Sequence, residues 1–292
     1  MREYRPIRGT AAPITAAVGV ATIFVVAVLI VPAAITAWAL NVQCQQGVVC
    51  VGTNSDDNIS GTTVQDVING RAGYDTIYGF GENDEIAAGN GDDNVQGGSG
   101  NDKINGAGGD DNPLSGNDGI DEIRGGLGND VIKGGPDDDR NPGLYGDDGS
   151  DVINGNAGND WVWGNEGDDR VYGDVGTDLV SGNAGNDHVY GGDDSDSVYG
   201  GPGNDGVFGA NGDDIITGGS EGDGFGGDYL EGGYGNDRLT DNDEGNDILY
   251  GGPGADSFYC GPGNNDRIGD FDASDGDVLY QDHGCEVVMQ FQ

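Results

Sequence analysis

A nine-residue pattern recurs through most of the 292-residue chain and constrains the fold more than any other feature of the sequence. Each copy reads Gly-Gly-x-Gly-x-Asp-x-U-x, where U is a large apolar residue, and clean copies begin at Gly97, Gly125, Gly200, Gly232 and Gly251. We number the positions of a repeat from one to nine, so that the aspartate occupies position six. A short fixed period predicts a solenoid in which each repeat stacks on its neighbours.

The position-six aspartates mark 23 repeats, and most neighbouring aspartates are nine residues apart. The longer intervals coincide with short insertions, which in a solenoid are expected to bulge from the stacked core as loops. These insertions lie at 113–115, 140–143, 220–226, 241–244 and 260–265.

The two halves of a repeat predict two kinds of local structure. The Gly-rich half predicts a turn, because glycine adopts positive φ without steric cost. The x-U-x half predicts a very short strand whose apolar residue points to one face and whose two neighbours point to the other. The residues expected to point inward are mostly β-branched: Ile59, Ile68, Ile77, Ile86, Val95, Ile104, Ile123, Ile132, Ile153, Val162, Val171, Val180, Val189, Val198, Val207, Ile216, Leu230, Leu239, Leu249, Phe258 and Ile268.

The composition indicates that this thin core needs help to hold the chain together. Apolar residues make up 34% of the sequence, whereas ordinary globular domains contain about 45–50%. The chain carries 53 acidic residues but only 11 Lys plus Arg, which gives a formal net charge of -42. Such a composition is typical of disorder, but a regular period is not, and the two agree if the folded state binds many cations. We expect no nucleic acid partner, because phosphate contacts need Lys and Arg.

Residues 1–39 form a different kind of segment. Three arginines in the first eight residues precede a stretch, 16–40, that is almost wholly apolar, which predicts export of the rest of the chain. Two interpretations stay open: a signal peptide cut after Ala37-Trp38-Ala39, or an uncleaved hydrophobic helix that anchors the chain in a membrane. Either way we expect the repeats to be extracellular, secreted or at the cell surface, with membrane contact only through this segment if it is uncleaved.

Four cysteines also favour an oxidising compartment. Three disulfide pairings are possible, and we expect Cys44–Cys50 and Cys260–Cys285 because the two pairs lie at opposite ends of the repeats. The alternative is four free thiols in a reducing compartment. The expected organisation is therefore a signal peptide or anchor (1–39), an N-terminal cap with Cys44 and Cys50 (40–51), the repeat domain (52–268) and a C-terminal cap (269–292).

Over about residues 50–269, the tandem nonapeptides resemble the RTX, or hemolysin-type, calcium-binding repeat family. The resemblance implies an all-β, right-handed parallel β-roll, a solenoid in which two repeats form one turn. It also implies that calcium ions lie between loops of successive turns, bound by position-six aspartates and main-chain carbonyls. The aspartates that it assigns as calcium ligands are Asp57, Asp75, Asp84, Asp93, Asp102, Asp111, Asp121, Asp130, Asp151, Asp160, Asp169, Asp178, Asp187, Asp196, Asp205, Asp214, Asp237 and Asp256.

The residue chemistry points to the same metal independently. Calcium takes about 6–8 oxygen ligands from carboxylates, carbonyls and water, and a loop of Gly, Asn and Asp offers only such oxygens. If each ion joins a repeat to the second repeat after it, up to about 21 ions can bind. The position-six aspartates beside insertions or in irregular repeats are weaker candidates: Asp66, Asp139, Asp228, Asp247 and Asp266.

The sequence favours a non-enzymatic role. The histidines are His188 and His283, and neither a His-Glu-x-x-His nor a Gly-x-Ser-x-Gly motif occurs. We expect a structural or adhesive module; the alternative is a secreted hydrolase or toxin-related protein of the RTX kind.

Aromatic residues recur at position nine. Tyr172, Tyr190 and Phe208 are 18 residues apart and are expected to stack on one outer face, with Trp163 and Tyr199 on the opposite face. This column is either a structural ladder on a sheet or a strip that binds a cell-surface glycan or another surface protein.

Overall fold

The computed structural model describes residues 40–219, 227–242, 245–261, 265–280 and 285–287. The chain divides into two units, Met1–Thr36 and Ala37–Gln292, and every described residue belongs to the second unit. The hydrophobic helix or signal segment predicted over 1–39 therefore lies outside the described residues. Within the described part of the chain, no helix has the length and hydropathy needed to cross a membrane.

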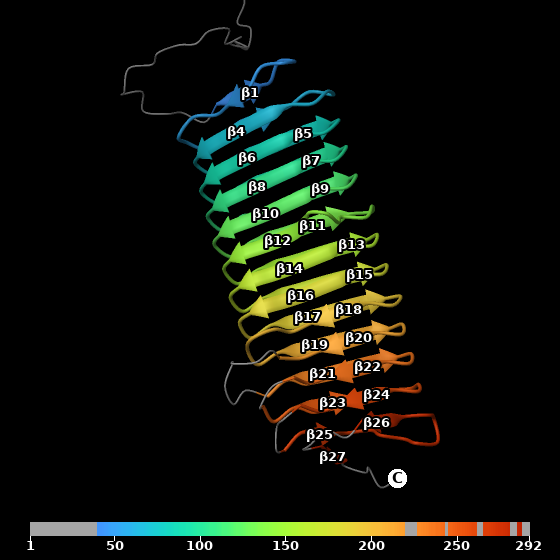
Figure 1. The fold of residues 1–292 in the computed structure, drawn as a ribbon. Coiled ribbons are helices and arrows are strands. Elements are labelled where there is room, and N and C mark those ends of the chain that lie inside the picture. Colours follow the sequence, from blue (N-terminus) through green and yellow to red (C-terminus); the bar gives the residue numbers. More distant parts are fainter. Residues whose placement is uncertain (1–39, 220–226, 243–244, 262–264, 281–284, 288–292) are drawn as a thin grey trace, which may run out of the picture. The chain divides into compact units, whose positions relative to one another are not determined.

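The described residues form two long parallel sheets that lie back to back (Figure 1). Consecutive strands alternate between the sheets, so each turn of the chain supplies one strand to each. The predicted all-β parallel β-solenoid, with two repeats in each turn, is thus confirmed.

The first sheet has 14 strands: β1 (Asn41–Gln43), β3 (Asn58–Ser60), β5 (Thr76–Gly81), β7 (Asn94–Ser99), β9 (Leu114–Asp118), β11 (Val131–Gly135), β13 (Val152–Ala157), β15 (Arg170–Val175), β17 (His188–Asp193), β19 (Gly206–Asn211), β21 (Tyr229–Tyr234), β23 (Ile248–Tyr250), β25 (Arg267–Ile268) and β27 (Glu286–Val287). The second sheet has 13 strands: β2 (Cys50–Val51), β4 (Val67–Ala72), β6 (Glu85–Asn90), β8 (Lys103–Gly108), β10 (Glu122–Leu127), β12 (Gly143–Asp148), β14 (Trp161–Glu166), β16 (Leu179–Ala184), β18 (Ser197–Tyr199), β20 (Ile215–Thr217), β22 (Arg238–Thr240), β24 (Ser257–Tyr259) and β26 (Val278–Tyr280).

The register stacks equivalent repeat positions directly on one another. In β15 and β17, Val171 lies opposite Val189 and Tyr172 lies opposite Tyr190. Because each strand pairs with the strand two repeats later, every column of the solenoid contains the same repeat position from alternate repeats.

The core lies between the two sheets and consists of the position-eight residues. All the predicted inward residues are buried, with exposed fractions of 0–1%. Leu114 and Leu144 are equally buried but were missing from the sequence prediction. Their repeats carry the extra residues between the aspartate and the apolar position, which shifts the leucines out of the nine-residue count.

Each end of the solenoid contains one disulfide. Cys44 pairs with Cys50, and Cys260 pairs with Cys285, with Cα–Cα distances of 5.2 Å and 5.8 Å. The predicted pairing is confirmed. The segments expected as caps supply the end strands β1 and β2 at one end and β26 and β27 at the other.

Candidate metal centre

The position-six aspartates are buried, and each is bonded to its equivalent on the next turn. All have exposed fractions of 3% or less. The main-chain N–H of Asp160 donates to Oδ1 of Asp178 over 2.7 Å, and that of Asp178 donates to Oδ1 of Asp196 over 2.8 Å. The carboxylates thus form continuous ladders along the solenoid.

There are two such ladders, one at the start of the strands of each sheet. The ladder of the 14-stranded sheet contains Asp57, Asp75, Asp93, Asp111, Asp130, Asp151, Asp169, Asp187, Asp205, Asp228, Asp247 and Asp266. The ladder of the 13-stranded sheet contains Asp66, Asp84, Asp102, Asp121, Asp139, Asp160, Asp178, Asp196, Asp214, Asp237, Asp256 and Asp277.

In most rungs the second carboxylate oxygen is buried and has no hydrogen-bond partner among the described residues. A buried polar oxygen without a partner is costly, so these atoms point to a missing ligand. The oxygen concerned is Oδ2 of Asp75, Asp84, Asp93, Asp102, Asp111, Asp121, Asp130, Asp139, Asp151, Asp160, Asp169, Asp178, Asp187, Asp196, Asp214, Asp237 and Asp256.

The ladders hold like charges close together away from water. Burial raises the pKa of Asp160 to about 7 and that of Asp169 to about 8. The hydrogen bond that each carboxylate accepts from the main-chain N–H of the preceding rung lowers its pKa, and the neighbouring carboxylates raise it. Near neutral pH such carboxylates need either a proton or a cation.

A main-chain carbonyl oxygen lies beside many of these carboxylate oxygens. Gly155 stands five residues before Asp160, at position one. A β-carbon on Gly155 would lie 2.6 Å from Oδ2 of Asp160 and 2.8 Å from the carbonyl oxygen of Gly173 on the next turn. At Gly191 the corresponding distances are 2.6 Å to Oδ2 of Asp196 and 2.9 Å to the carbonyl oxygen of Gly209.

This donor set fits calcium. Oxygen atoms from two successive turns converge beside the position-one glycine, and both are of the hard type that Ca²⁺ prefers. The position-six carboxylates and the position-one glycine carbonyls would hold the ion. When bound, it would supply the positive charge that the buried carboxylates lack and would link the two turns.

The structure separates the predicted ligands at the N-terminal end from the rest. Both carboxylate oxygens of Asp57 accept main-chain N–H groups, from Leu40 over 2.8 Å and from Thr53 over 2.5 Å. Oδ2 of Asp66 likewise accepts the N–H of Thr62 over 2.5 Å. Asp57 and the weaker candidate Asp66 lie in the ladders like the other predicted ligands, and so do the weaker candidates Asp139, Asp228, Asp247 and Asp266, but Oδ2 of Asp57 and of Asp66 already has a main-chain donor.

Two aspartates join the candidate site that sequence reasoning did not single out. Asp277 ends the ladder of the 13-stranded sheet, donated to by Asp256 N–H over 3.0 Å. The spacing Asp277-Val278-Leu279 repeats the Asp-x-U pattern and could have revealed it.

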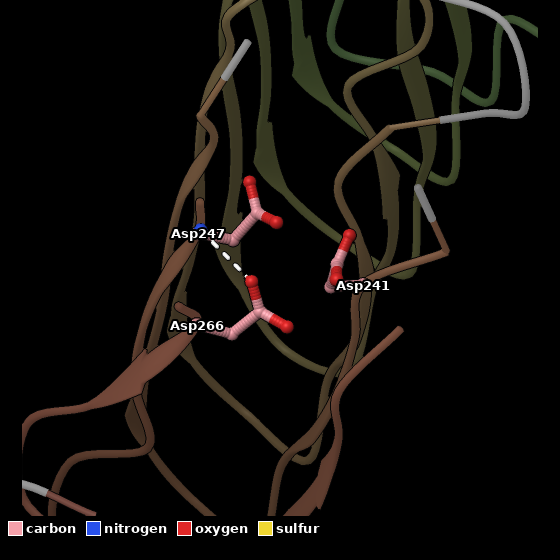
Figure 2. Close-up of side chains that lie close together, drawn as sticks. All are labelled: Asp241, Asp247 and Asp266. Carbon is pink, nitrogen blue, oxygen red and sulfur yellow. Dashed lines mark hydrogen bonds between the residues drawn. The ribbon is translucent and has the colours of Figure 1, made fainter. Parts of the chain in front are cut away.

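The second is Asp241, which takes the place of a position-one glycine. Its carboxyl group gathers with those of Asp247 and Asp266, with one oxygen from each lying within 4.8 Å of the others (Figure 2). One Asp241 oxygen accepts the main-chain N–H of Gly261 over 3.0 Å. Three buried carboxylates therefore meet here.

A parallel β-solenoid whose edges carry ladders of buried carboxylates belongs to the metal-stabilised repeat proteins. The family model of the RTX calcium-binding nonapeptide repeat (4 copies) matches residues 51–86, 60–95, 78–113, 115–140, 145–180, 172–207, 222–243 and 243–266. The chain therefore belongs to the RTX calcium-binding repeat family, and calcium is the ion its repeats bind. A search of the curated proteins finds no match.

Proposed function

We propose that this calcium-binding β-roll is exported, folds only when calcium is bound, and acts as a non-enzymatic structural or adhesive module outside the cytoplasm. The observation that carries the proposal is the paired ladder of buried carboxylates with unsatisfied oxygens. About 21 divalent ions would neutralise the formal charge of -42. Because no such site exists in an unfolded chain, binding and folding free energies are linked.

A calcium titration of the full chain tests the folding part of this proposal. We expect little β-structure by circular dichroism in excess chelator and a cooperative gain as calcium is added, while magnesium is much less effective. Full β-structure in chelator at pH 8 would refute calcium-driven folding. The number of ions bound per chain, measured by atomic emission, counts the ladder sites in use.

Two features support export. The disulfides Cys44–Cys50 and Cys260–Cys285 suit an oxidising compartment. Calcium sites with this many carboxylates suit a compartment where calcium is plentiful. Cell fractionation and intact-mass measurement of the native protein test location and cleavage after Ala39 together.

For the adhesive role we favour another surface protein over a glycan as partner. Tyr172 stacks on Tyr190, and Tyr190 on Phe208, each with ring centroids 4.8 Å apart and planes within 9°. Rings stacked in this way cover one another's faces, whereas sugars bind to open faces. The column therefore presents ring edges and hydroxyl groups, which suit a protein surface.

Paired assays separate the alternatives. Replacing Tyr190 and Phe208 by serine is expected to abolish binding to a protein partner on whole cells and to leave a glycan array unaffected. Array binding by the wild-type protein that these substitutions remove would favour the glycan. A hydrolase screen on the calcium-loaded chain tests the enzymatic alternative.

A further inference from the structure

Position five of the repeats carries a second set of side-chain ladders, visible at Asn186. The main-chain N–H and the Nδ2 of Asn186 both donate to Oδ1 of Asp168 on the preceding turn, over 2.8 Å and 3.0 Å. Oδ1 of Asn186 in turn accepts the N–H and the Nδ2 of Asn204, over 3.1 Å and 3.0 Å. Asparagine is suited to this place because it donates to one turn and accepts from the other.

The same interlock recurs on the opposite edge. Asn159 donates its N–H and its Nδ2 to Oδ1 of Asp138, both over 2.9 Å. Asn236 donates the same two groups to Oδ1 of Asp213, over 2.8 Å and 3.0 Å. The arrangement is therefore a property of the repeat and not of one loop.

These bonds run in the opposite sense to those of position six. The N–H of Asn186 reaches back to the preceding turn, whereas the N–H of the next residue, Asp187, reaches forward to Oδ1 of Asp205 over 2.8 Å. Adjacent amides of one loop are thus held by opposite neighbours. Main-chain hydrogen bonds join successive turns on either side of these two residues, from Gly185 N–H to the Pro202 carbonyl over 3.0 Å and from His188 N–H to the Asp169 carbonyl over 2.9 Å. The position-five and position-six side chains bind the two amides that lie between them.

The position-five ladders are divided into runs. Thr177 donates its N–H to Oδ1 of Asn159 over 3.1 Å. Among the described residues, its side chain accepts no hydrogen bond from Ser195, the position-five residue of the next turn. A new run starts at Ser195, whose hydroxyl oxygen accepts the N–H of Asp213 over 3.1 Å. The break falls at Thr177, whose hydroxyl oxygen accepts no hydrogen bond from Ser195 in the part of the chain that the structure describes, whereas Asn and Asp extend a carboxamide or carboxylate oxygen to the next turn.

We propose that the position-five Asn and Asp residues are positioning residues that fix the distance between successive calcium loops and couple calcium binding along each run. This inference rests on the proposed binding of calcium between loops. The candidate ligands, a position-six carboxylate and a glycine carbonyl, belong to consecutive turns, and the ladder residue is the direct neighbour of the carboxylate. A preset spacing lowers the ordering cost of each ion that follows.

The test compares variants of the full chain in calcium titrations followed by calorimetry and circular dichroism. Asn186→Ala removes the Nδ2 bond to Asp168 and the acceptor for both donors of Asn204, while the main-chain N–H of residue 186 can still donate to Asp168. We expect the calcium midpoint to rise about two- to tenfold, as the loss of a hydrogen bond implies, and the Hill slope to fall, with the number of bound ions unchanged. Asn186→Ser restores an acceptor, as Ser195 does, and is expected to recover part of the loss.

Thr177 supplies the matched control and the gain of function. Thr177→Ala removes no ladder bond and is expected to titrate like the wild type. Thr177→Asn adds the missing acceptor, joins two runs and is expected to lower the midpoint and steepen the curve. This variant decides the matter if Asn186→Ala fails to fold in saturating calcium.

Two results would overturn the proposal: wild-type midpoints and slopes in both Asn186→Ala and Thr177→Asn, or a lower ion count in Asn186→Ala, which would make Asn186 a ligand. A wild-type chain that takes up no calcium would instead refute the proposed function. The two failures are therefore distinguishable.

Discussion

At the residue scale, position one is glycine in most repeats, although Ala88 and Asp241 also stand there. Beside the α-carbon of Gly155 the space already holds two oxygen atoms. The neighbours of Gly155 are the carboxylate of Asp160 and the carbonyl of Gly173. Position three has no such restriction at Gly81. A β-carbon on Gly81, at position three, would meet nothing closer than the Ser99 hydroxyl oxygen at 3.5 Å.

This contrast predicts a position-specific effect of alanine. Gly155→Ala should raise the calcium midpoint and lower the stability of the calcium-loaded chain by about 1–3 kcal/mol, the usual cost of overpacking. Gly81→Ala should change neither quantity appreciably. Thermal unfolding at fixed calcium concentration measures both variants. Equal unfolding temperatures would contradict the crowding of oxygen atoms beside Gly155.

The raised carboxyl pKa values predict the pH dependence of the metal-free chain. An aspartate in an unfolded chain has a pKa near 3.9, whereas burial raises those of Asp160 and Asp169 to about 7 and about 8. Between about pH 4 and pH 8 the folded state binds more protons than the unfolded state, so its stability falls as pH rises.

In excess chelator we therefore expect more β-structure at pH 5 than at pH 8. In calcium the trend reverses for affinity, because protons compete for the same oxygens, and the midpoint should rise as pH falls below about 7. Circular dichroism across this range measures both trends. A circular dichroism signal of the metal-free chain that does not vary with pH would contradict the raised pKa values of the buried aspartates.

At the element scale, each strand owes its place to the column of buried residues in which it stacks. Leu144 of β12 is 0% exposed, between Ile123 and Val162 in the register. We expect Leu144→Ala to lower the free energy of unfolding by about 2–5 kcal/mol. Leu127, which is 61% exposed, supplies the control, and Leu127→Ala should cost little. Chemical denaturation in saturating calcium compares them, and equal losses would argue against the register.

The repeat period predicts the strands, the buried column and the position-six aspartates, because each depends on a fixed spacing. It fails at Leu114 and Leu144, where the insertion falls between the aspartate and the strand instead of before the aspartate. It also overlooks position five, because Asn and Asp are common turn residues and only the stacking of turns shows their bonds. Asp241 is hidden for the same reason, since Asp266 comes from a later repeat.

At the scale of the whole molecule, the stacked repeats end at two segments that each contain a disulfide. The Cys260–Cys285 bond closes a separation of 25 residues, against 6 for Cys44–Cys50. Longer loops lose more entropy when closed, so Cys260→Ser with Cys285→Ser should destabilise the calcium-loaded chain by about 2–4 kcal/mol. The Cys44→Ser, Cys50→Ser pair should cost less. Hydrogen exchange should show that each pair of substitutions lowers protection at the end that contains it. An equal loss of protection along the whole solenoid would contradict this prediction.

The stacking also has a mechanical consequence. The bonds between turns, such as Thr76 N–H to Asp57 O at 2.8 Å, run along the direction in which the strands stack. Tension applied between the two ends of the solenoid therefore loads one interface at a time, and turns should peel off singly. A regular turn holds 18 residues and should release about 60 Å of chain, and turns with insertions should release more. Single-molecule pulling should show regular steps of this length, at higher force in calcium than in chelator, whereas one abrupt rupture would contradict it. A protein with this response extends under load in small increments and dissipates work at each of them.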